Sequence, residues 1–215
     1  MDSPIAIVLT GGAPLRAAPD LPGDALVIAA DSGLHLAADL HLEVDVVVGD
    51  LDSVEAAALA SARSAGVTVD EHPVDKDATD LELAVTFAID HGANHIIVLG
   101  GWGGRFDHLL GNATLLAGPL LAHTRVEWHS STATVRPCRP GAPVTISGQP
   151  GDLASLVPLG GDVHGVTTSG LAWPLNDTTL AFGTTRGISN RLVGDAAMVA
   201  VVAGMLVTIH ERGPS

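Results

Sequence analysis

Short runs rich in β-branched residues alternate with amphipathic stretches through the first half of this 215-residue chain. Such alternation predicts parallel strands separated by helices, because two parallel neighbours need a crossover connection that packs on the sheet. We therefore expect an α/β domain with a parallel sheet and helices on both faces. The predicted strands are Ile5–Leu9, Ala25–Ala30, Val44–Val48, Val67–Asp70 and His95–Leu99.

Two of the intervening helices have clear sequence signals. Thr79 and Glu82 form a capping-box pattern, which is typical of a helix start. The apolar residues that follow at helical spacing predict a buried face made of Leu81, Ala84, Val85 and Ala88. A second helix is expected from about Phe106 to Leu116, and its predicted buried side consists of Phe106, Leu109, Leu110 and Ala113.

The pattern changes after Gly118-Pro119 to short strands separated by Gly, Pro, Ser, Thr and Asp. This change predicts an antiparallel β-sandwich or a barrel, and we take the sandwich as the fold of the second domain. The boundary is expected between about Gly118 and Arg125, which gives domains of residues 1–120 and 121–215. The predicted strands are Arg125–Trp128, Pro143–Ile146, Leu153–Val157, Val163–Thr167, Thr179–Phe182, Ala197–Val202 and Met205–His210.

The charge of the chain limits its partners. Its formal net charge is −14 and its pI is about 4.8, so the chain as a whole repels nucleic-acid backbones and anionic membrane surfaces. Neither nucleic acid nor a membrane is therefore expected as a partner. A small phosphorylated substrate stays compatible with this charge if a divalent cation and a few basic side chains neutralise the site locally.

The cysteine content and the apolar segments bear on the compartment. Cys138 is the only cysteine, so no internal disulfide can form, which fits a reducing compartment. It lies in Arg-Pro-Cys-Arg-Pro, which we interpret as an irregular turn, and a structural role is favoured over a catalytic thiol. The amino terminus has no basic stretch ahead of an apolar run, and Ala196–Ile209 is shorter than the roughly 20 residues that span a bilayer. A cytoplasmic protein is expected.

Two acidic turns follow predicted strands of the sheet. Asp50 and Asp52 come directly after the strand Val44–Val48, at the end of the sheet where α/β folds bind ligands, and Ser53 is a candidate N-cap. Asp77 and Asp80 lie between the next strand and helix. Each turn alone also fits a solvated turn with a helix cap. Together they would repel each other without a cation between them, which favours a metal site formed by Asp50, Asp52, Asp77 and Asp80.

A glycine-rich segment follows the strand His95–Leu99. Four glycines between Gly100 and Gly104 let a backbone approach a ligand closely, and Arg105 can hold phosphate oxygens. The next helix start adds free amide groups, so the segment is a candidate phosphate loop. Asp107 and His108 can form a proton-handling pair, although a helix-capping aspartate beside a surface histidine fits the same residues.

Taken in order along the chain, these segments resemble the motifs of the thiamine pyrophosphokinase family. The resemblance spans nearly the whole chain, and five motifs in order are specific where no single one is. The segments that carry it are Ala30-Asp31-Ser32-Gly33, Gly49-Asp50-Leu51-Asp52-Ser53, Lys76-Asp77-Ala78-Thr79-Asp80, Gly103-Gly104-Arg105-Phe106-Asp107-His108, and Ser169-Gly170-Leu171-Ala172-Trp173-Pro174-Leu175 with Ile188-Ser189-Asn190.

The resemblance implies a Rossmann-like first domain, Mg2+ as cofactor, and ATP and thiamine as substrates. It places Mg2+ on Asp50, Asp52 and Asp80, with Asp77 close by, and it assigns catalysis to these residues with Arg105 and Asp107. The nucleotide contacts that it implies are Asp31, Gly33, Ser53, Lys76, Thr79, Gly104, Arg105, His108 and Asn112. The thiamine contacts that it implies are Asp107, Trp173, Ser189 and Asn190. Without the resemblance, Trp173 also fits a hydrophobic plug at a domain or subunit boundary.

The resemblance further implies a homodimer whose sites lie between the α/β domain of one subunit and the β domain of the other. The expected reaction transfers pyrophosphate from ATP to the hydroxyl group of thiamine and releases AMP. Two segments depart from the family pattern: Asp31 to His35 lacks the usual second glycine and Ala-Asn pair, and Gly187-Ile188 replaces a more usual Ser-Thr. A pyrophosphokinase for another small alcohol and a non-catalytic thiamine- or nucleotide-binding regulator remain as alternatives.

Overall fold

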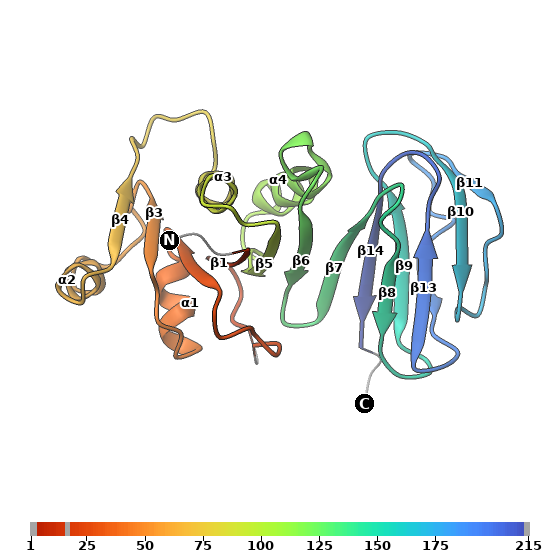
Figure 1. The fold of residues 1–215 in the computed structure, drawn as a ribbon, viewed down its shortest axis with the longest axis horizontal. Helices are drawn as coiled ribbons and strands as arrows, with labels where there is room; N and C mark the ends of the chain where they lie inside the picture. Colours follow the sequence, from red (N-terminus) through yellow and green to blue (C-terminus); the bar gives the residue numbers. More distant parts are fainter. Residues whose placement is uncertain (1–3, 16–17, 213–215) are drawn as a thin grey trace. The chain divides into compact units, whose positions relative to one another are not determined.

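The computed structural model describes residues 4–15 and 18–212, and its contacts divide the chain into two compact units. The first unit comprises residues 1–131 and the second residues 132–215. This division falls later in the chain than the predicted boundary near residue 120. Figure 1 shows helices and strands alternating in the first unit and strands alone in the second.

The first unit is built on a parallel sheet with the strand order β6-β5-β1-β2-β3-β4. All five strands predicted from the first half of the sequence are present, within two residues at each end. The strands are β1 (Ile5–Thr10), β2 (Leu26–Ala30), β3 (Val46–Gly49), β4 (Thr68–Glu71), β5 (His95–Gly100) and β6 (Arg125–His129). The order reverses between β1 and β5, and such a reversal is where α/β sheets place their ligands.

Helices cover both faces of this sheet, as predicted. They are α1 (Gly33–Asp39), α2 (Ala56–Ser64), α3 (Asp80–Asp90) and α4 (Phe106–Ala117), followed by the short 3-10 helix η1 (Pro119–Leu121). Leu36 of α1 packs with Leu9 of β1, and Leu59 of α2 packs with Ala29 of β2. Leu9 and Ala29 are paired across the sheet, so α1 and α2 lie on one face. Figure 1 shows α3 on the opposite face.

The two helices differ in how well the sequence predicted which residues are buried. Helix α3 is confirmed in detail: the Thr79 hydroxyl accepts from the Glu82 amide at 3.2 Å, and the predicted apolar residues are buried. Helix α4 has the predicted bounds within one residue, but its predicted buried side was wrong at Phe106 and Leu110, while Leu109 and Ala113 are half-buried. Phe106 is 71% exposed and Leu110 is 52% exposed, because the helix instead turns Asn112 inward to a loop carbonyl.

Strand β6 corrects a second prediction. The sequence assigned Arg125–Trp128 to the antiparallel domain, but β6 pairs in parallel with β5 and belongs to the first unit. Its apolar side chains Val126 and Trp128 are buried. The local pattern of a strand does not reveal the direction of its neighbour, which the connection through α4 decides.

The second unit is the predicted antiparallel sandwich, made of two sheets with orders β12-β9-β14-β7 and β11-β10-β13-β8. Its strands are β7 (Ala133–Cys138), β8 (Val144–Ser147), β9 (Leu153–Pro158), β10 (Val163–Ser169), β11 (Thr178–Leu180), β12 (Asn190–Arg191), β13 (Ala196–Ala200) and β14 (Leu206–Glu211). The apolar stretch Ala196–Ile209 thus supplies two strands, one to each sheet. No helix among the described residues is long and apolar enough to cross a membrane.

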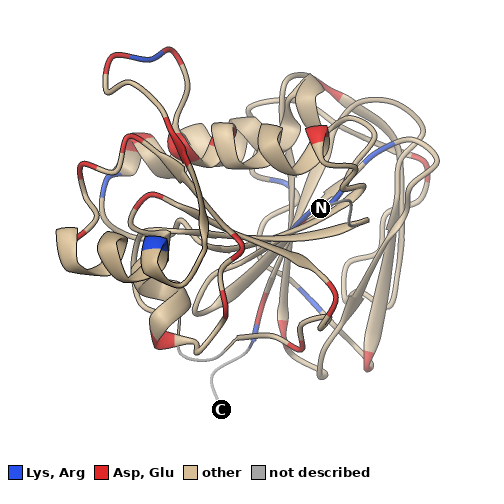
Figure 2. Cartoon of the chain, turned by 60° about the vertical axis from the view of Figure 1, so that its left-hand side comes forward, with Lys and Arg blue, Asp and Glu red and all other residues tan. Residues whose placement is uncertain are grey.

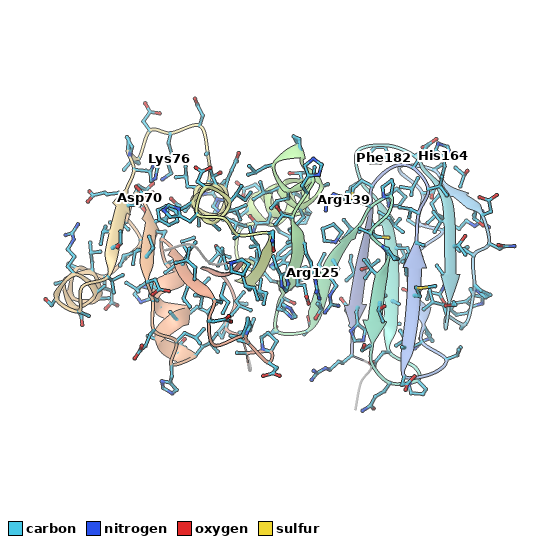
Figure 3. The ribbon with its side chains drawn as sticks, in the orientation of Figure 1. Asp70, Lys76, Arg125, Arg139, His164 and Phe182 are labelled. Atoms are coloured by element: carbon cyan, nitrogen blue, oxygen red, sulfur yellow. The ribbon has the colours of Figure 1, made fainter. Side chains whose placement is uncertain are left out.

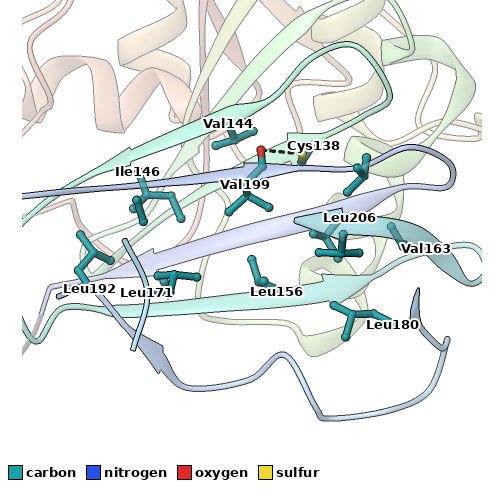
Figure 4. Packing of buried hydrophobic residues seen from close by; sticks show 14 residues of the cluster. Cys138, Val144, Ile146, Leu156, Val163, Leu171, Leu180, Leu192, Val199 and Leu206 are labelled. Carbon is teal, nitrogen blue, oxygen red and sulfur yellow. Dashed lines mark hydrogen bonds between the residues drawn. The ribbon is translucent and has the colours of Figure 1, made fainter. Parts of the chain in front are cut away.

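Apolar side chains from both sheets fill the interior of the second unit (Figure 4). Cys138 belongs to this core: it is fully buried at the end of β7, and its Sγ donates to the carbonyl oxygen of Val199 at 3.4 Å. The predicted irregular turn around Cys138 was therefore wrong. Burial raises the pKa of the Cys138 thiol to about 11, so the structural role is confirmed over a reactive thiolate.

Candidate functional site

The predicted site segments of the first unit all leave the carboxyl edge of the parallel sheet. Asp31 follows β2, Asp50 follows β3, and the glycine-rich loop follows β5. Parallel strands end at the same edge, so segments distant in sequence meet there. Figure 2 shows acidic residues, in red, recurring along the segments that join strands to helices.

Three carboxylates form a compact group at this edge. Oxygen atoms of Asp31, Asp50 and Asp52 all lie within 4.8 Å of one another. Asp31 is 7% exposed, and its Oδ1 has no hydrogen-bond partner among the residues that the structure describes. Both Asp31 (φ 46°) and Leu51 (φ 63°) adopt the left-handed conformation, which is uncommon for residues with a Cβ. The chain therefore turns sharply just after β2 and just after β3, and these turns bring the carboxylates together.

Asp80 joins this region through contacts at the end of β3. A Cβ on Gly49 would lie 2.8 Å from the Asp80 Oδ1 and 3.2 Å from the Asp31 Cβ, so only glycine leaves room for both aspartates. Burial raises the pKa of Asp31; hydrogen bonds from Ser32 and Ser53 oppose the shift, and the charges of Asp80 and Asp50 add to it. The carboxylates of Asp31, Asp50 and Asp80 are thus held close together in a region partly shielded from solvent.

Lys76 lies between two of these aspartates. Its Nζ is 2.5 Å from the Asp50 Oδ2 and 2.9 Å from the Asp80 Oδ1, and its side chain is mostly shielded from solvent. Figure 3 shows Lys76 on the segment that leads from β4 to α3. The hydrogen bond from Lys76 lowers the pKa of Asp50, and the pKa of Lys76 is raised by the two carboxylates although burial works against it. Lys76 is the only lysine in the chain.

These residues fit a magnesium ion. Mg2+ binds oxygen ligands, and carboxylates at helix and strand ends supply them in phosphate-transfer sites. The buried Asp31 Oδ1 without a partner supplies an acceptor that a cation would satisfy. Of the predicted ligands, Asp50 and Asp52 belong to the compact group and Asp80 is adjacent to it. Asp77 is exposed and lies outside the group, so its role stays a prediction.

Ser53 and Thr79 have clear local roles. Ser53 is not the helix cap that the sequence predicted: α2 begins at Ala56 with Glu55 as its N-cap, and the Ser53 hydroxyl donates to the Asp52 Oδ1 at 2.9 Å. Thr79 caps α3, which fixes the start of the helix that carries Asp80. Both residues thus position aspartates, and their predicted nucleotide contacts stay predictions.

The glycine-rich loop needs its glycines. Gly100, Gly101, Gly103 and Gly104 have φ between 67° and 92°, a conformation that strains other residues. The base of the loop is held by side chains, because Trp128 Nε1 donates to the Gly100 carbonyl at 2.6 Å and Asn112 Nδ2 donates to the Gly101 carbonyl at 3.2 Å. Sequence reasoning missed this role of Trp128, since nothing in its neighbourhood indicates a partner 28 residues away.

Arg105 and Asp107 stand at the exposed end of this loop. Arg105 donates through Nε and a terminal nitrogen to the two carboxylate oxygens of Asp107, at 3.1 and 2.6 Å. The Arg105 guanidinium holds the pKa of Asp107 at about 2, and the amide of His108 donates to the same carboxylate. An aspartate with so low a pKa is a weak base but a constant hydrogen-bond acceptor.

Gly33, one of the predicted nucleotide contacts, has a packing reason of its own. A Cβ at this position would lie 2.1 Å from the carbonyl oxygen of Leu9, so helix α1 can approach β1 only through glycine. The departure from the family pattern after Asp31 therefore leaves the helix start intact, with Ser32 as N-cap.

In the second unit, two of the three predicted thiamine contacts are exposed. Trp173 is 61% exposed, and Ser189 is exposed with φ 62°. Asn190 is 7% exposed and bonds to the backbone of Trp173. Gly187, where the chain departs from the family pattern, also has a packing reason. A Cβ at this position would lie 2.2 Å from the carbonyl oxygen of Leu156 in β9.

Two family profiles match the chain, one to each unit. The profile described as thiamin pyrophosphokinase, catalytic domain, matches residues 21–127, and the profile described as thiamin pyrophosphokinase, vitamin B1 binding domain, matches residues 144–206. The chain belongs to the thiamine pyrophosphokinase family. The two matches place the family's catalytic domain on the unit with the carboxylates and its vitamin-binding domain on the unit with Trp173.

Individual family members are similar over most of this chain. Thiamine pyrophosphokinase of Bacillus subtilis is 28% identical over 95% of this chain and 98% of its own. Thiamine pyrophosphokinase 1 of Arabidopsis thaliana is 30% identical over 78% of this chain and 66% of its own. The crystal structure of the Bacillus subtilis family member superposes with a TM-score of 0.84 and covers 98% of this chain and 99% of the other.

Proposed function

We propose that this protein transfers pyrophosphate from ATP to thiamine, giving thiamine diphosphate and AMP, with Mg2+ as the cofactor. The family supports the reaction, and the single structural observation that carries the metal assignment is the compact carboxylate group of Asp31, Asp50 and Asp52. A cytoplasmic site of action belongs to this proposal because the co-substrate is ATP.

The reaction needs positioning and charge neutralisation more than covalent help from the protein. The thiamine hydroxyl oxygen forms a bond to the β-phosphorus of ATP, while the bond from that phosphorus to the oxygen shared with the α-phosphorus breaks. AMP leaves with that oxygen, and the hydroxyl proton passes to solvent. Magnesium, when bound by these carboxylates, would neutralise charge on the phosphate oxygens.

The residues of the first unit have separable tasks in this scheme. Asp31, Asp50, Asp52 and Asp80 would hold the metal, and Asp77 remains a proposed further ligand. Lys76 lies beside them and would turn from the carboxylates to the phosphates. Arg105 would bind phosphate oxygens, and the ionised Asp107 would accept a hydrogen bond from the thiamine hydroxyl and so orient it.

The remaining predicted contacts belong to the two substrates. Trp173 would stack on a ring of thiamine, because an electron-poor cationic ring favours an aromatic face. Gly104 and His108 would contact the nucleotide at the glycine-rich loop, and Asn112 would act from beneath that loop. We further propose a homodimer in which the α/β domain of one copy and the β domain of the other complete each site, as the family resemblance implies.

The direct test is AMP formation from Mg-ATP, measured with and without thiamine, with the thiamine product identified by mass. Thiamine-dependent AMP with an equal amount of thiamine diphosphate is expected. AMP formation with another small alcohol but not with thiamine would replace the acceptor in the proposal. Thiamine binding by the folded protein without any AMP in the presence of Mg2+ would instead support a binding role.

A further inference from the structure

The turn that carries Trp173 is tied to a second segment by a short ladder of backbone contacts. The Ala172 amide donates to the Arg191 carbonyl at 2.8 Å, and the Val193 amide donates to the Gly170 carbonyl at 3.0 Å. Residues 170–173 therefore run beside residues 190–193 in antiparallel fashion. This ladder brings Asn190 next to Trp173 although 17 positions separate them in the chain.

The Asn190 side chain completes this contact with both of its polar atoms. Its Oδ1 accepts from the Trp173 amide at 3.1 Å, and its Nδ2 donates to the Trp173 carbonyl at 2.8 Å. The same Oδ1 also accepts from the Arg191 amide at 2.8 Å. A carboxamide that bonds to the N–H and the C=O of one residue fixes that residue's main chain in the way a strand neighbour does.

Burial separates Asn190 from its two neighbours in the family motif. Asn190 is 7% exposed, whereas Trp173 is 61% exposed and Ser189 is also exposed. The Ser189 amide is held by the Ser155 hydroxyl at 3.0 Å, and the left-handed backbone at Ser189 turns the chain so that Asn190 faces inward. The amide of Asn190 is therefore directed to the main chain, while Trp173 and Ser189 face outward.

We infer that Asn190 is a positioning residue that acts on thiamine through Trp173 rather than by touching it. The inference rests on the proposed function, because it assigns how the same substrate is recognised. Asparagine suits this task because aspartate lacks the Nδ2 donor for the Trp173 carbonyl and alanine lacks both groups. We call the two hydrogen bonds between the Asn190 side chain and the Trp173 backbone the clamp. Without the clamp the Trp173 backbone is less ordered, so thiamine binding must also supply the free energy that orders it.

The test is a double-mutant cycle on thiamine binding, measured by calorimetry with Trp173→Ala, Asn190→Ala and the combined variant. If Asn190 acts through Trp173, Asn190→Ala raises the thiamine Kd on the order of tenfold in the parent protein. In the Trp173→Ala background the same change has less than about a twofold effect. Asn176→Ala, at an exposed asparagine of the same unit, is the matched control and leaves the Kd unchanged.

An equal loss in both backgrounds would overturn the inference, because it means that Asn190 contacts thiamine directly. Hydrogen exchange of the Trp173 amide gives an independent readout: it is slow in the parent and in Asn176→Ala and fast in Asn190→Ala. Equal exchange in all three proteins would also overturn the clamp. If Asn190→Ala does not fold, Asn190→Asp takes its place, since it keeps the Oδ1 acceptor and replaces the donor with a charged oxygen that repels the Trp173 carbonyl. The same cycle in the Trp173→Ala background then corrects for the direct attraction of the new charge to thiamine.

The exchange measurement also separates this inference from the proposed function. A folded parent that binds no thiamine would remove the thiamine assignment and with it the substrate role of Asn190. A protected Trp173 amide that loses protection in Asn190→Ala would then still establish the clamp itself.

Discussion

The two units prepare their candidate site residues in opposite ways. The first unit brings together four carboxylates at the edge of its sheet, with one lysine between two of them. The second unit places an exposed aromatic ring on a turn whose backbone is held by a neutral amide. Like charges at short range are unfavourable until a cation arrives, whereas the aromatic turn is complete without a ligand.

The difference indicates where binding energy comes from in each unit. In the first unit, a ligand gains by relieving repulsion and by satisfying the buried Asp31 Oδ1. In the second unit, a ligand gains by contact with an aromatic residue whose main chain is already held in place. Changes in the first unit should therefore act on the chemical step, and changes in the second should act on thiamine affinity.

The largest effect is expected from removing a charge in the carboxylate group. Asp50→Asn keeps the shape but removes a metal ligand, and turnover should fall by about 10³-fold or more with the fold intact. Asp80→Asn should behave alike. Steady-state AMP release checks both variants, with Asp90→Asn at the exposed end of α3 as the control. Full activity in Asp50→Asn would remove the metal assignment.

A smaller effect, of a different kind, is expected in the second unit. Trp173→Ala should raise the KM for thiamine by about threefold to thirtyfold and leave the KM for ATP unchanged, because a cation–π contact contributes about 0.5–1 kcal/mol at exposed sites and about 2 kcal/mol when desolvated. Phe182→Ala, at another exposed aromatic residue of the same unit, should change neither constant. A fall in kcat alone would contradict the division between the two units.

Mixing two damaged proteins tests whether the two regions cooperate between copies. In an equal mixture of Asp50→Asn and Trp173→Ala subunits, assayed at low thiamine, half of the dimers are mixed and each mixed dimer has one intact site. About a quarter of the parent activity should therefore return if sites form between subunits. A mixture of Asp50→Asn with Asp80→Asn should stay inactive. No recovery in the first mixture, with subunit exchange verified, would place each site within one chain or in a monomer.

The smallest effect is expected from changing Lys76, which contacts Asp50 and Asp80. Lys76 neutralises Asp50 and Asp80 without metal, so Lys76→Met should raise the Mn2+ affinity of the nucleotide-free protein by about threefold to tenfold. A titration followed by electron paramagnetic resonance measures this affinity. Arg63→Met, which breaks an exposed ion pair with Glu71 outside the group, is the control. Unchanged or weaker Mn2+ binding would mean that Lys76 does not compete with the metal.

The sequence predicted most of the elements because hydrophobic period and capping are local properties. Helix α3 is the clearest case, since the Thr79 cap and its apolar face both follow from adjacent residues. Half of the predicted buried face of α4 and the predicted direction of β6 were wrong because each depends on a distant partner. The Asn112 amide reaches Gly101, and β6 takes its direction from β5, and neither contact has a local signal.

The same division holds at the site. The sequence by itself determined that Asp50 and Asp52 follow a strand of the sheet, because strand ends and glycines are marked in the chain. Only the tertiary structure brought Asp31 into the group with Asp50 and Asp52, placed Lys76 between Asp50 and Asp80, and turned Asn190 onto the Trp173 backbone. The physical reason is that side-chain direction depends on backbone conformation, including the left-handed turns at Asp31 and Ser189, and on contacts between segments far apart in sequence.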